Sequence, residues 1–146
     1  MTATRTLAHG LGVLGLIPFV ALAVLIAAAP TETPLLSRAL LYYGATILAF
    51  LGGVYWGLAL RADESVYPAF LALAVVPQLI GFGALLLPTP WAHVLLAAAL
   101  VGVLVIDVAY WRTSLMPRWL LSLRVMLSLV AAISMFVAAA ALRVPN

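Results

Sequence analysis

The stretch ALLYYGATILAFLGGVYWGLAL, residues 39–60, indicates most clearly which class of fold this chain adopts. It runs for 22 residues without a charge, and Arg38 and Arg61 flank it. A helix needs about 20 mainly apolar residues to cross the hydrocarbon core of a bilayer, because each residue adds only about 1.5 Å of length. The length of the stretch and its lack of charge therefore predict a transmembrane helix.

Four further apolar runs of similar length accompany this stretch: residues 11–29, 66–87, 91–110 and 119–142. The connections between the runs are short, so consecutive helices should be antiparallel neighbours. The first run is long enough to span a bilayer, and we interpret it as a retained helix rather than a cleaved signal peptide. We therefore expect an all-α fold, an integral membrane bundle of five transmembrane helices that forms a single domain over residues 1–146.

The composition indicates that lipid is the solvent of this chain. Of its residues 67% are hydrophobic and 8% are charged, against about 45–50% and about 25% in soluble domains. The net charge is +3, but the basic residues are single, scattered arginines, so we expect no binding to nucleic acid. The chain has no cysteine, which excludes disulfides, thiolate catalysis and thiolate metal sites.

The arginines predict how the bundle is oriented in the membrane. In the predicted topology one side holds four of them: Arg5, Arg61, Arg112 and Arg118. The other side holds two, Arg38 and Arg143. Cytoplasmic loops carry an excess of basic residues, and the Tyr and Trp residues, which favour membrane interfaces, fall near the two predicted interfaces. Both signals predict a cytoplasmic N-terminus and a C-terminus on the opposite side.

Two charges lie within the predicted spans, Asp107 in the fourth and Arg124 in the fifth. Ionisable side chains at membrane depth are costly and mark candidate functional sites. Each lies about 6–8 Å from the loop that joins the two helices, so they share one depth and could form an ion pair. Three interpretations stay open: a proton or ligand group held by Arg124, a structural clasp of the last hairpin, and an arginine that snorkels to the surface.

Small residues recur every four positions in the second span: Ala45, Ala49, Gly53 and Gly57. In lipid, small residues let helix backbones approach closely and so determine contact faces. The row predicts a buried ridge that packs within the chain. A contact between two copies, giving a homo-oligomer, is the alternative use of the same row.

Two prolines interrupt predicted spans, Pro18 in the first and Pro77 in the third. Proline kinks a membrane helix and frees backbone carbonyl groups. Gln78, next to Pro77, is the most polar side chain near the predicted midplane. A pocket between kinked helices could use Pro18, Pro77 and Gln78, whereas an interhelical hydrogen bond would also account for Gln78.

The two histidines argue against a cofactor. His9 falls at the inner interface and His93 at the outer one, so a single chain cannot bring both to one haem or metal ion. The predicted topology also brings no hydroxyl, histidine and carboxylate together. We therefore expect no cofactor, no metal and no enzymatic activity.

Several stretches together resemble a known family. They are residues 15–19 (GLIPF), 43–45 (YGA), 50–57 (FLGGVYWG), Pro77, Asp107, 117–119 (PRW) and 123–124 (LR). This set is similar to the DUF3429 domain family of small membrane proteins, and it covers essentially the whole chain. The resemblance implies a five-span, multi-pass protein of the bacterial inner membrane or of mitochondrial type, in which Asp107 and Arg124 belong to the shared pattern. It implies no established activity.

These features favour an accessory subunit or assembly factor of a larger membrane complex, because the chain is small, lacks a catalytic set and offers small-residue faces. Its expected partners are the lipid bilayer and other membrane proteins. The alternative is the binding or transport of a hydrophobic small molecule, a quinone or lipid, between the kinked helices. A third hypothesis is proton-linked transport that uses Asp107.

Overall fold

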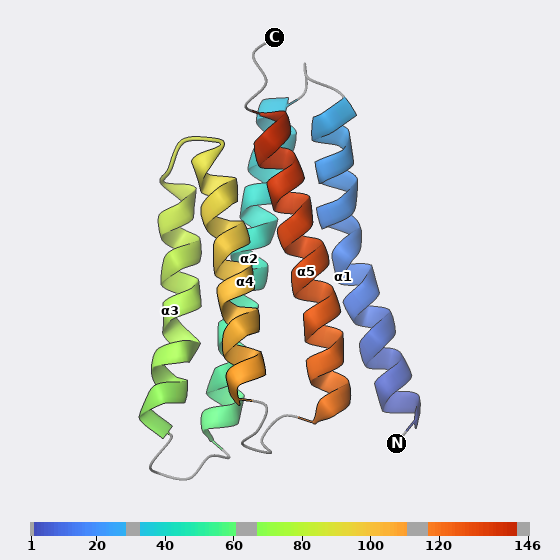
Figure 1. The fold of residues 1–146 in the computed structure, drawn as a ribbon, viewed down its shortest axis with the longest axis vertical. Helices are drawn as coiled ribbons and strands as arrows, with labels where there is room; N and C mark the ends of the chain where they lie inside the picture. The colour runs from blue at the N-terminus through green and yellow to red at the C-terminus, as the bar shows by residue number, and fades with distance from the viewer. Residues whose placement is uncertain (1, 29–32, 61–66, 111–116, 143–146) are drawn as a thin grey trace.

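The computed structural model describes residues 2–28, 33–60, 67–110 and 117–142. Within these ranges the chain forms five helices and no strand: α1 Thr2–Ala28, α2 Thr33–Ala59, α3 Tyr67–Leu85, α4 Trp91–Tyr110 and α5 Arg118–Ala141 (Figure 1). All five are long and apolar enough to cross a membrane. The predicted fold class, an all-α bundle of five spans, is confirmed.

The helix boundaries follow the predicted ones most closely in the last two spans. α4 has the predicted bounds, and α5 begins and ends one residue earlier than predicted. α3 ends at Leu85 instead of 87, and the chain then turns more tightly, with the N–H groups of Leu86 and Leu87 donating to carbonyl oxygens three residues earlier. The predicted boundaries at Ala29 and Val66 lie outside the described residues, as do Arg61, Arg112 and Arg143.

The first two helices begin earlier than the apolar runs indicate. α2 already includes Pro34, which the first turn accepts because the N–H that proline lacks has no partner there. The polar start of α1 is held against α5: the Arg5 guanidinium carbon lies 5.9 Å from the centre of the Trp119 ring, and the His9 ring lies 6.4 Å from it. Hydropathy marks only the part of a helix in lipid, so it misses such polar turns.

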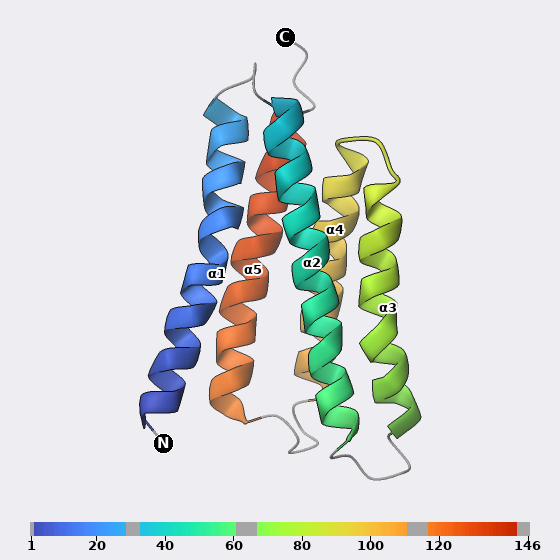
Figure 2. The same cartoon turned by 180° about the vertical axis from the view of Figure 1, so that it is seen from behind.

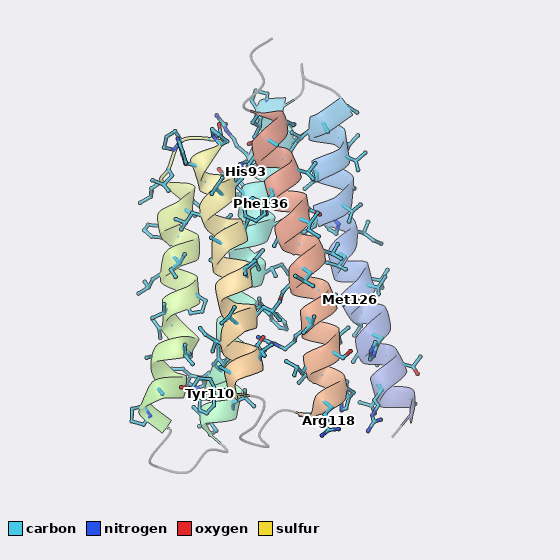
Figure 3. All side chains as sticks on the ribbon, in the orientation of Figure 1. His93, Tyr110, Arg118, Met126 and Phe136 are labelled. Atoms are coloured by element: carbon cyan, nitrogen blue, oxygen red, sulfur yellow. The ribbon has the colours of Figure 1, made fainter. Side chains whose placement is uncertain are left out.

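The helices are arranged with α1 and α3 at opposite edges of the bundle and α2, α4 and α5 between them (Figures 1 and 2). The most extensive contacts join α2 to α3, α4 to α5 and α1 to α5. We call the end where α1 begins the N end and the opposite end the C end. The side-chain view places Tyr110 and Arg118 near the N end and His93 near the C end (Figure 3).

The predicted ridge of small residues is wrong: its two glycines do not lie on the face of α2 that contacts the neighbouring helices. Gly53 and Gly57 are exposed, and a Cβ added to either would meet nothing within 4 Å. Ala45 and Ala49 are only partly buried. An α-helix turns about 40° beyond a full circle every four residues, so the three steps from Ala45 to Gly57 turn the row by about 120° and away from the contact face.

The close contacts of α2 are made at Gly44 and Gly52, each one residue before a member of the predicted row. A Cβ at Gly52 would collide with the carbonyl oxygen of Ala74 on α3, and one at Gly44 would collide with the Met135 side chain of α5. The buried face of α2 continues through Leu48 and Tyr55. Glycine at these two positions lets the α2 backbone lie close to the α3 backbone and to the Met135 side chain.

Adjacent glycines provide a matched test of this register. We expect Gly52→Leu to lower the free energy of unfolding by about 1–3 kcal/mol or more. The new side chain would collide with the Ala74 backbone, which cannot move aside as a flexible side chain can. Gly53→Leu adds the same side chain into open space and should leave folding unchanged. Thermal unfolding and size-exclusion profiles in mild detergent measure both. Equal effects of the two substitutions would contradict the observed α2 face.

Candidate functional site

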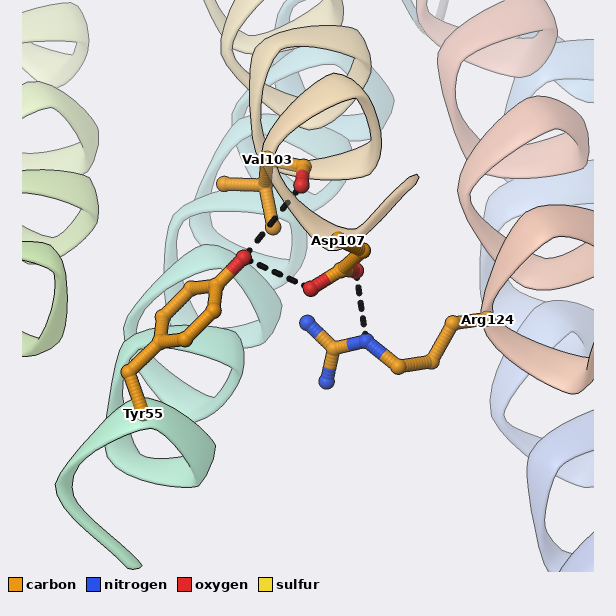
Figure 4. A network of polar contacts seen from close by, with 4 residues as sticks. All are labelled: Tyr55, Val103, Asp107 and Arg124. Atoms are coloured by element: carbon orange, nitrogen blue, oxygen red, sulfur yellow. Dashed lines mark hydrogen bonds and ion pairs between the residues drawn. The ribbon is translucent and has the colours of Figure 1, made fainter. Parts of the chain in front are cut away.

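The structure brings Asp107 of α4 and Arg124 of α5 together inside the bundle. The Arg124 Nε–H donates to the Asp107 Oδ2 at 2.6 Å, and the two residues are only 5% and 1% exposed (Figure 4). The guanidinium therefore does not snorkel to the surface. The two candidates that the sequence singled out form one buried ion pair.

A third residue, Tyr55 of α2, completes this network. Its hydroxyl lies 2.7 Å from Asp107 Oδ1 and 3.3 Å from the Val103 carbonyl oxygen. The single hydroxyl proton favours the shorter contact, since hydrogen bonds to an ionised acceptor are the stronger ones. The Arg124 guanidinium carbon also lies 5.7 Å from the Tyr55 ring centre, within the range of a cation–π contact. Tyr55, Asp107 and Arg124, here the polar triad, thus join three helices.

Tyr55 was not predicted to belong to the site, because tyrosine near a helix end is typical of the membrane interface. The residue is 1% exposed and turned into the bundle. One signal was available: Tyr55 lies four residues before the end of α2 and Asp107 three before the end of α4, and both helices end at the N end. The two side chains therefore share one depth, but depth alone does not tell which way a side chain points.

The network compensates both charges in a medium that solvates neither. Each Asp107 oxygen has a hydrogen-bond donor, one from Arg124 and one from Tyr55. A lone charge at the centre of a membrane helix costs about 2.5–3.5 kcal/mol on insertion scales. Pairing offsets much of that cost, while loss of one partner leaves the other buried and unpaired.

One donor of the triad has no partner. A guanidinium group carries five N–H donors, and the Arg124 Nη2 is buried without a hydrogen-bond partner among the described residues. The ion pair uses Nε, and Nη2 itself exposes almost no surface. Arg124 is also part of the wall of a cavity.

This cavity, which we call the lateral cavity, lies between α1, α2 and α5, with Leu100 of α4 also in its wall, and has a volume of about 350 Å³. Its wall is apolar except for Arg124 and Ser128, both on α5. Two of its lining residues, Leu11 of α1 and Phe50 of α2, are 60% and 67% exposed. In a membrane these two residues face the lipid, so the cavity opens sideways into the bilayer between α1 and α2.

The prediction that Pro18, Pro77 and Gln78 line a pocket is wrong, because none of the three lines the lateral cavity. Pro77 is buried where α2 meets α3, and Gln78 is exposed on the outer side of α3, because successive helix residues point about 100° apart. Pro18 precedes the lining residue Phe19 but does not line the cavity. The lateral cavity lies instead beside small α1 residues, among them Gly12 and Gly15.

The histidines lie at opposite ends of the bundle, as the sequence indicates. His9 is exposed near the N end, and its Nδ1 lies 2.8 Å from the Arg5 carbonyl oxygen. His93, in the first turn of α4, is fully buried near the C end, and neither ring nitrogen has a hydrogen-bond partner among the described residues. No three His, Asp or Glu side chains come together in the described part of the chain.

Five spanning helices around a buried ion pair define a polytopic α-helical membrane protein with an intramembrane polar network. Comparison with known families gives the particular group: residues 4–140 match the family described as "Protein of unknown function (DUF3429)", so the chain belongs to this family. The resemblance noted in the sequence is thereby confirmed.

Two animal proteins named Transmembrane protein 69 are similar to this chain. The one from Xenopus tropicalis is 37% identical over 129 residues, which cover 86% of this chain. The one from Mus musculus is 32% identical over 129 residues, which cover 84% of this chain. The chain spans about half the length of these relatives, 50% and 51%. No solved structure matches it.

A double-mutant cycle tests the coupling within the polar triad. We expect Asp107→Leu and Arg124→Met each to lower the free energy of unfolding by about 3–5 kcal/mol, because each leaves one charge buried and unpaired. The double variant should lose much less than the sum, since it buries no charge. Tyr55→Phe should cost about 1.5–3 kcal/mol through the lost hydrogen bond to a charged group.

Unfolding of the purified variants in mild detergent, followed by circular dichroism, gives these free energies. Ser134→Ala serves as the control, because it removes a hydroxyl that bonds only within α5, to the Val130 carbonyl oxygen. Additive losses in the Asp107 and Arg124 double variant would contradict an energetic coupling between the two side chains.

Proposed function

We propose that this protein binds a hydrophobic small molecule, a quinone or a lipid, in the lateral cavity. One observation carries the proposal: an almost wholly apolar cavity, with Arg124 and Ser128 as its polar lining residues, lies beside the lipid-facing residues Leu11 and Phe50. Small-molecule sites are typically concave and apolar, with a small number of polar groups. A hydrophobic molecule that fills this cavity removes apolar surface from water or lipid contact and can hydrogen-bond to the Ser128 hydroxyl.

The form of the cavity supports the same proposal. Its volume of about 350 Å³ lies at the lower end of the range for small-molecule sites, about 300–1,000 Å³. Along α1 its lining residues run from Ala8 to Phe19, which corresponds to about 16 Å of helix. A ring and the first part of an apolar tail fit that length. The lipid-facing side between Leu11 and Phe50 leaves a path for the rest of the tail.

Location and orientation are part of the proposal. We place the protein in the bacterial inner membrane with the N end in the cytoplasm. The described arginines Arg5 and Arg118 support this orientation, since both lie at the N end, whereas Arg38 lies toward the C end. The cavity then has its arginine in the cytoplasmic half of the membrane.

Ligand retention tests the proposal. We expect wild-type protein purified in mild detergent to carry one bound quinone or lipid, identified by mass spectrometry of the organic extract. Gly15→Leu should lower that occupancy at least tenfold, because the side chain fills the lateral cavity, while its Cβ makes only an ordinary van der Waals contact, 3.8 Å from the Tyr43 hydroxyl.

Gly10→Leu is the matched control for this experiment. It adds the same side chain to the same helix at an exposed position that does not line the cavity, with nothing within 4 Å of the new Cβ. It should retain the ligand as the wild type does. A wild type that carries no molecule, or equal retention by both variants, would contradict the proposal.

A second candidate function, an accessory subunit or assembly factor of a membrane complex, is favoured by the position of Gln78. This side chain is exposed on α3 between Val75 and Phe82, which are also exposed, at the edge of the bundle. It makes no hydrogen bond within the described ranges. An amide facing hydrocarbon is unfavourable, so a polar group on a neighbouring membrane helix would stabilise it.

Photo-cross-linking tests this second function. A photoreactive amino acid in place of Leu79, beside Gln78, should give one discrete protein adduct in native membranes, and the added change Gln78→Leu should lower its yield at least fivefold. An adduct of twice the chain mass identifies a homo-oligomer. The same amino acid at Val105, exposed on α4, is the control and should give no such adduct. A yield that does not depend on Gln78 would contradict a partner that binds this amide.

A further inference from the structure

We infer that the ligand of the lateral cavity is an anionic glycerophospholipid, whose phosphate binds Arg5 and His9 at the N end while an acyl chain lies in the cavity. The inference rests on the proposed function and adds to it the chemical class of the head and the residues that bind it. It follows from where the cavity ends and from the charges of the side chains at that end.

A cluster of three side chains lies at the N end, where α1 and α5 are in contact. The guanidinium carbon of Arg5 lies 5.9 Å from the centre of the Trp119 ring, and the centres of the His9 and Trp119 rings are 6.4 Å apart. Arg5 and His9 are exposed, and Trp119 is partly buried. We call these three residues the interfacial cluster. Tryptophan favours the membrane–water interface, and basic residues there attract anionic lipid headgroups.

The interfacial cluster lies directly beyond one end of the lateral cavity. On α1, Arg5 is three residues before Ala8 and seven before Gly12, so the helix places all three on one face. Ala8 and Gly12 both line the cavity, and Ala8 is only about 4.5 Å along the helix axis from Arg5. On α5, Trp119 is one turn before the lining residue Leu123. A tail that lies in the cavity can therefore have its polar head at the cluster.

The charge of Arg5 favours an anionic head. Arg5 forms no ion pair within the described ranges. Asp107 is the one acidic residue in those ranges, and its two carboxylate oxygens are already bonded to Arg124 and Tyr55. A phosphate group can accept two parallel hydrogen bonds from a guanidinium group, and such charged pairs are stronger than neutral ones. An uncharged quinone head would leave Arg5 without a counter-charge.

His9 provides a second group for the phosphate. Its Nδ1 lies 2.8 Å from the Arg5 carbonyl oxygen, and because a carbonyl oxygen only accepts, Nδ1 is the donor in this bond. The bond holds the ring beside Arg5. Nε2 makes no hydrogen bond among the described residues. When the ring is protonated, Nε2 can donate to a phosphate oxygen.

A zwitterionic head fits the cluster less well. Its phosphate can bind Arg5, but its ammonium group needs an anionic or aromatic partner of its own. The described residues offer no carboxylate for it, and the Trp119 ring is already in cation–π contact with Arg5. Arg118, next to Trp119 in the sequence and near the N end in Figure 3, adds a further positive charge. A net negative head is therefore preferred.

Native mass spectrometry in mild detergent tests the inference. Delipidated protein is titrated with a phosphatidylglycerol, with a phosphatidylcholine of the same acyl chains, and with a ubiquinone. We expect the phosphatidylglycerol to occupy one saturable site and to bind at least tenfold more tightly than the other two. Glycerol phosphate, which carries the charged head without acyl chains, should not displace it at the same concentration, because it leaves the cavity empty.

Two substitutions of equal charge show where the head binds. Arg5→Gln should bring the affinity for phosphatidylglycerol to within twofold of that for phosphatidylcholine. Arg38→Gln removes the same charge at an exposed position toward the C end. It is the matched control and should keep the tenfold preference.

The outcomes separate the inference from the proposed function. Equal binding of the two phospholipids, or tightest binding of the quinone, would overturn the inference and support the lateral cavity if Gly15→Leu abolishes that binding. Displacement by glycerol phosphate, or an equal loss of preference in Arg5→Gln and Arg38→Gln, would likewise overturn the inference alone. If none of the three ligands binds saturably, or Gly15→Leu leaves all binding unchanged, the proposed function itself fails and the inference fails with it.

Discussion

The ion pair between Asp107 and Arg124 is the interaction on which the rest of this structure depends. Each charge alone would be strongly unfavourable in the membrane, so each requires the other at one depth and in one orientation. The 2.6 Å contact fixes α4 against α5, and the Tyr55 hydroxyl adds α2 to the same point. In lipid, where apolar surface alone gives little reason for helices to associate, such a network specifies which helices meet.

The same network connects stability to the proposed binding. Arg124 uses Nε for the ion pair and leaves Nη2 unpaired, although the residue is 95% buried. Arg124 also lines the lateral cavity, so the residue that pairs with Asp107 belongs as well to the wall of the proposed binding site.

The sequence predicted the spans and the depth of polar groups better than it predicted which way residues face. Apolar run length determines a membrane helix almost by itself, so the five spans and the shared depth of Asp107 and Arg124 could be predicted. The rotation of each helix depends on close contacts with its neighbours. The row ending at Gly53 and Gly57 therefore missed the Gly52 contact by one residue, and Gln78 was assigned to a pocket from which it points away. The lateral cavity is lined by residues of α1, α2, α4 and α5, which lie far apart in the sequence, so no local sequence pattern predicts it.

The most direct test of the account is the hydrogen exchange of the Arg124 side chain, measured by NMR on protein labelled with ¹⁵N-arginine and assigned with Arg124→Lys. We expect the Nε–H of Arg124, buried and bonded to Asp107, to exchange with water at least a hundredfold more slowly than that of the exposed Arg5. Asp107→Asn should abolish most of this protection, while Gly53→Leu should not change it. Exchange as fast as that of Arg5 in the wild type would contradict a buried ion pair at the centre of the bundle.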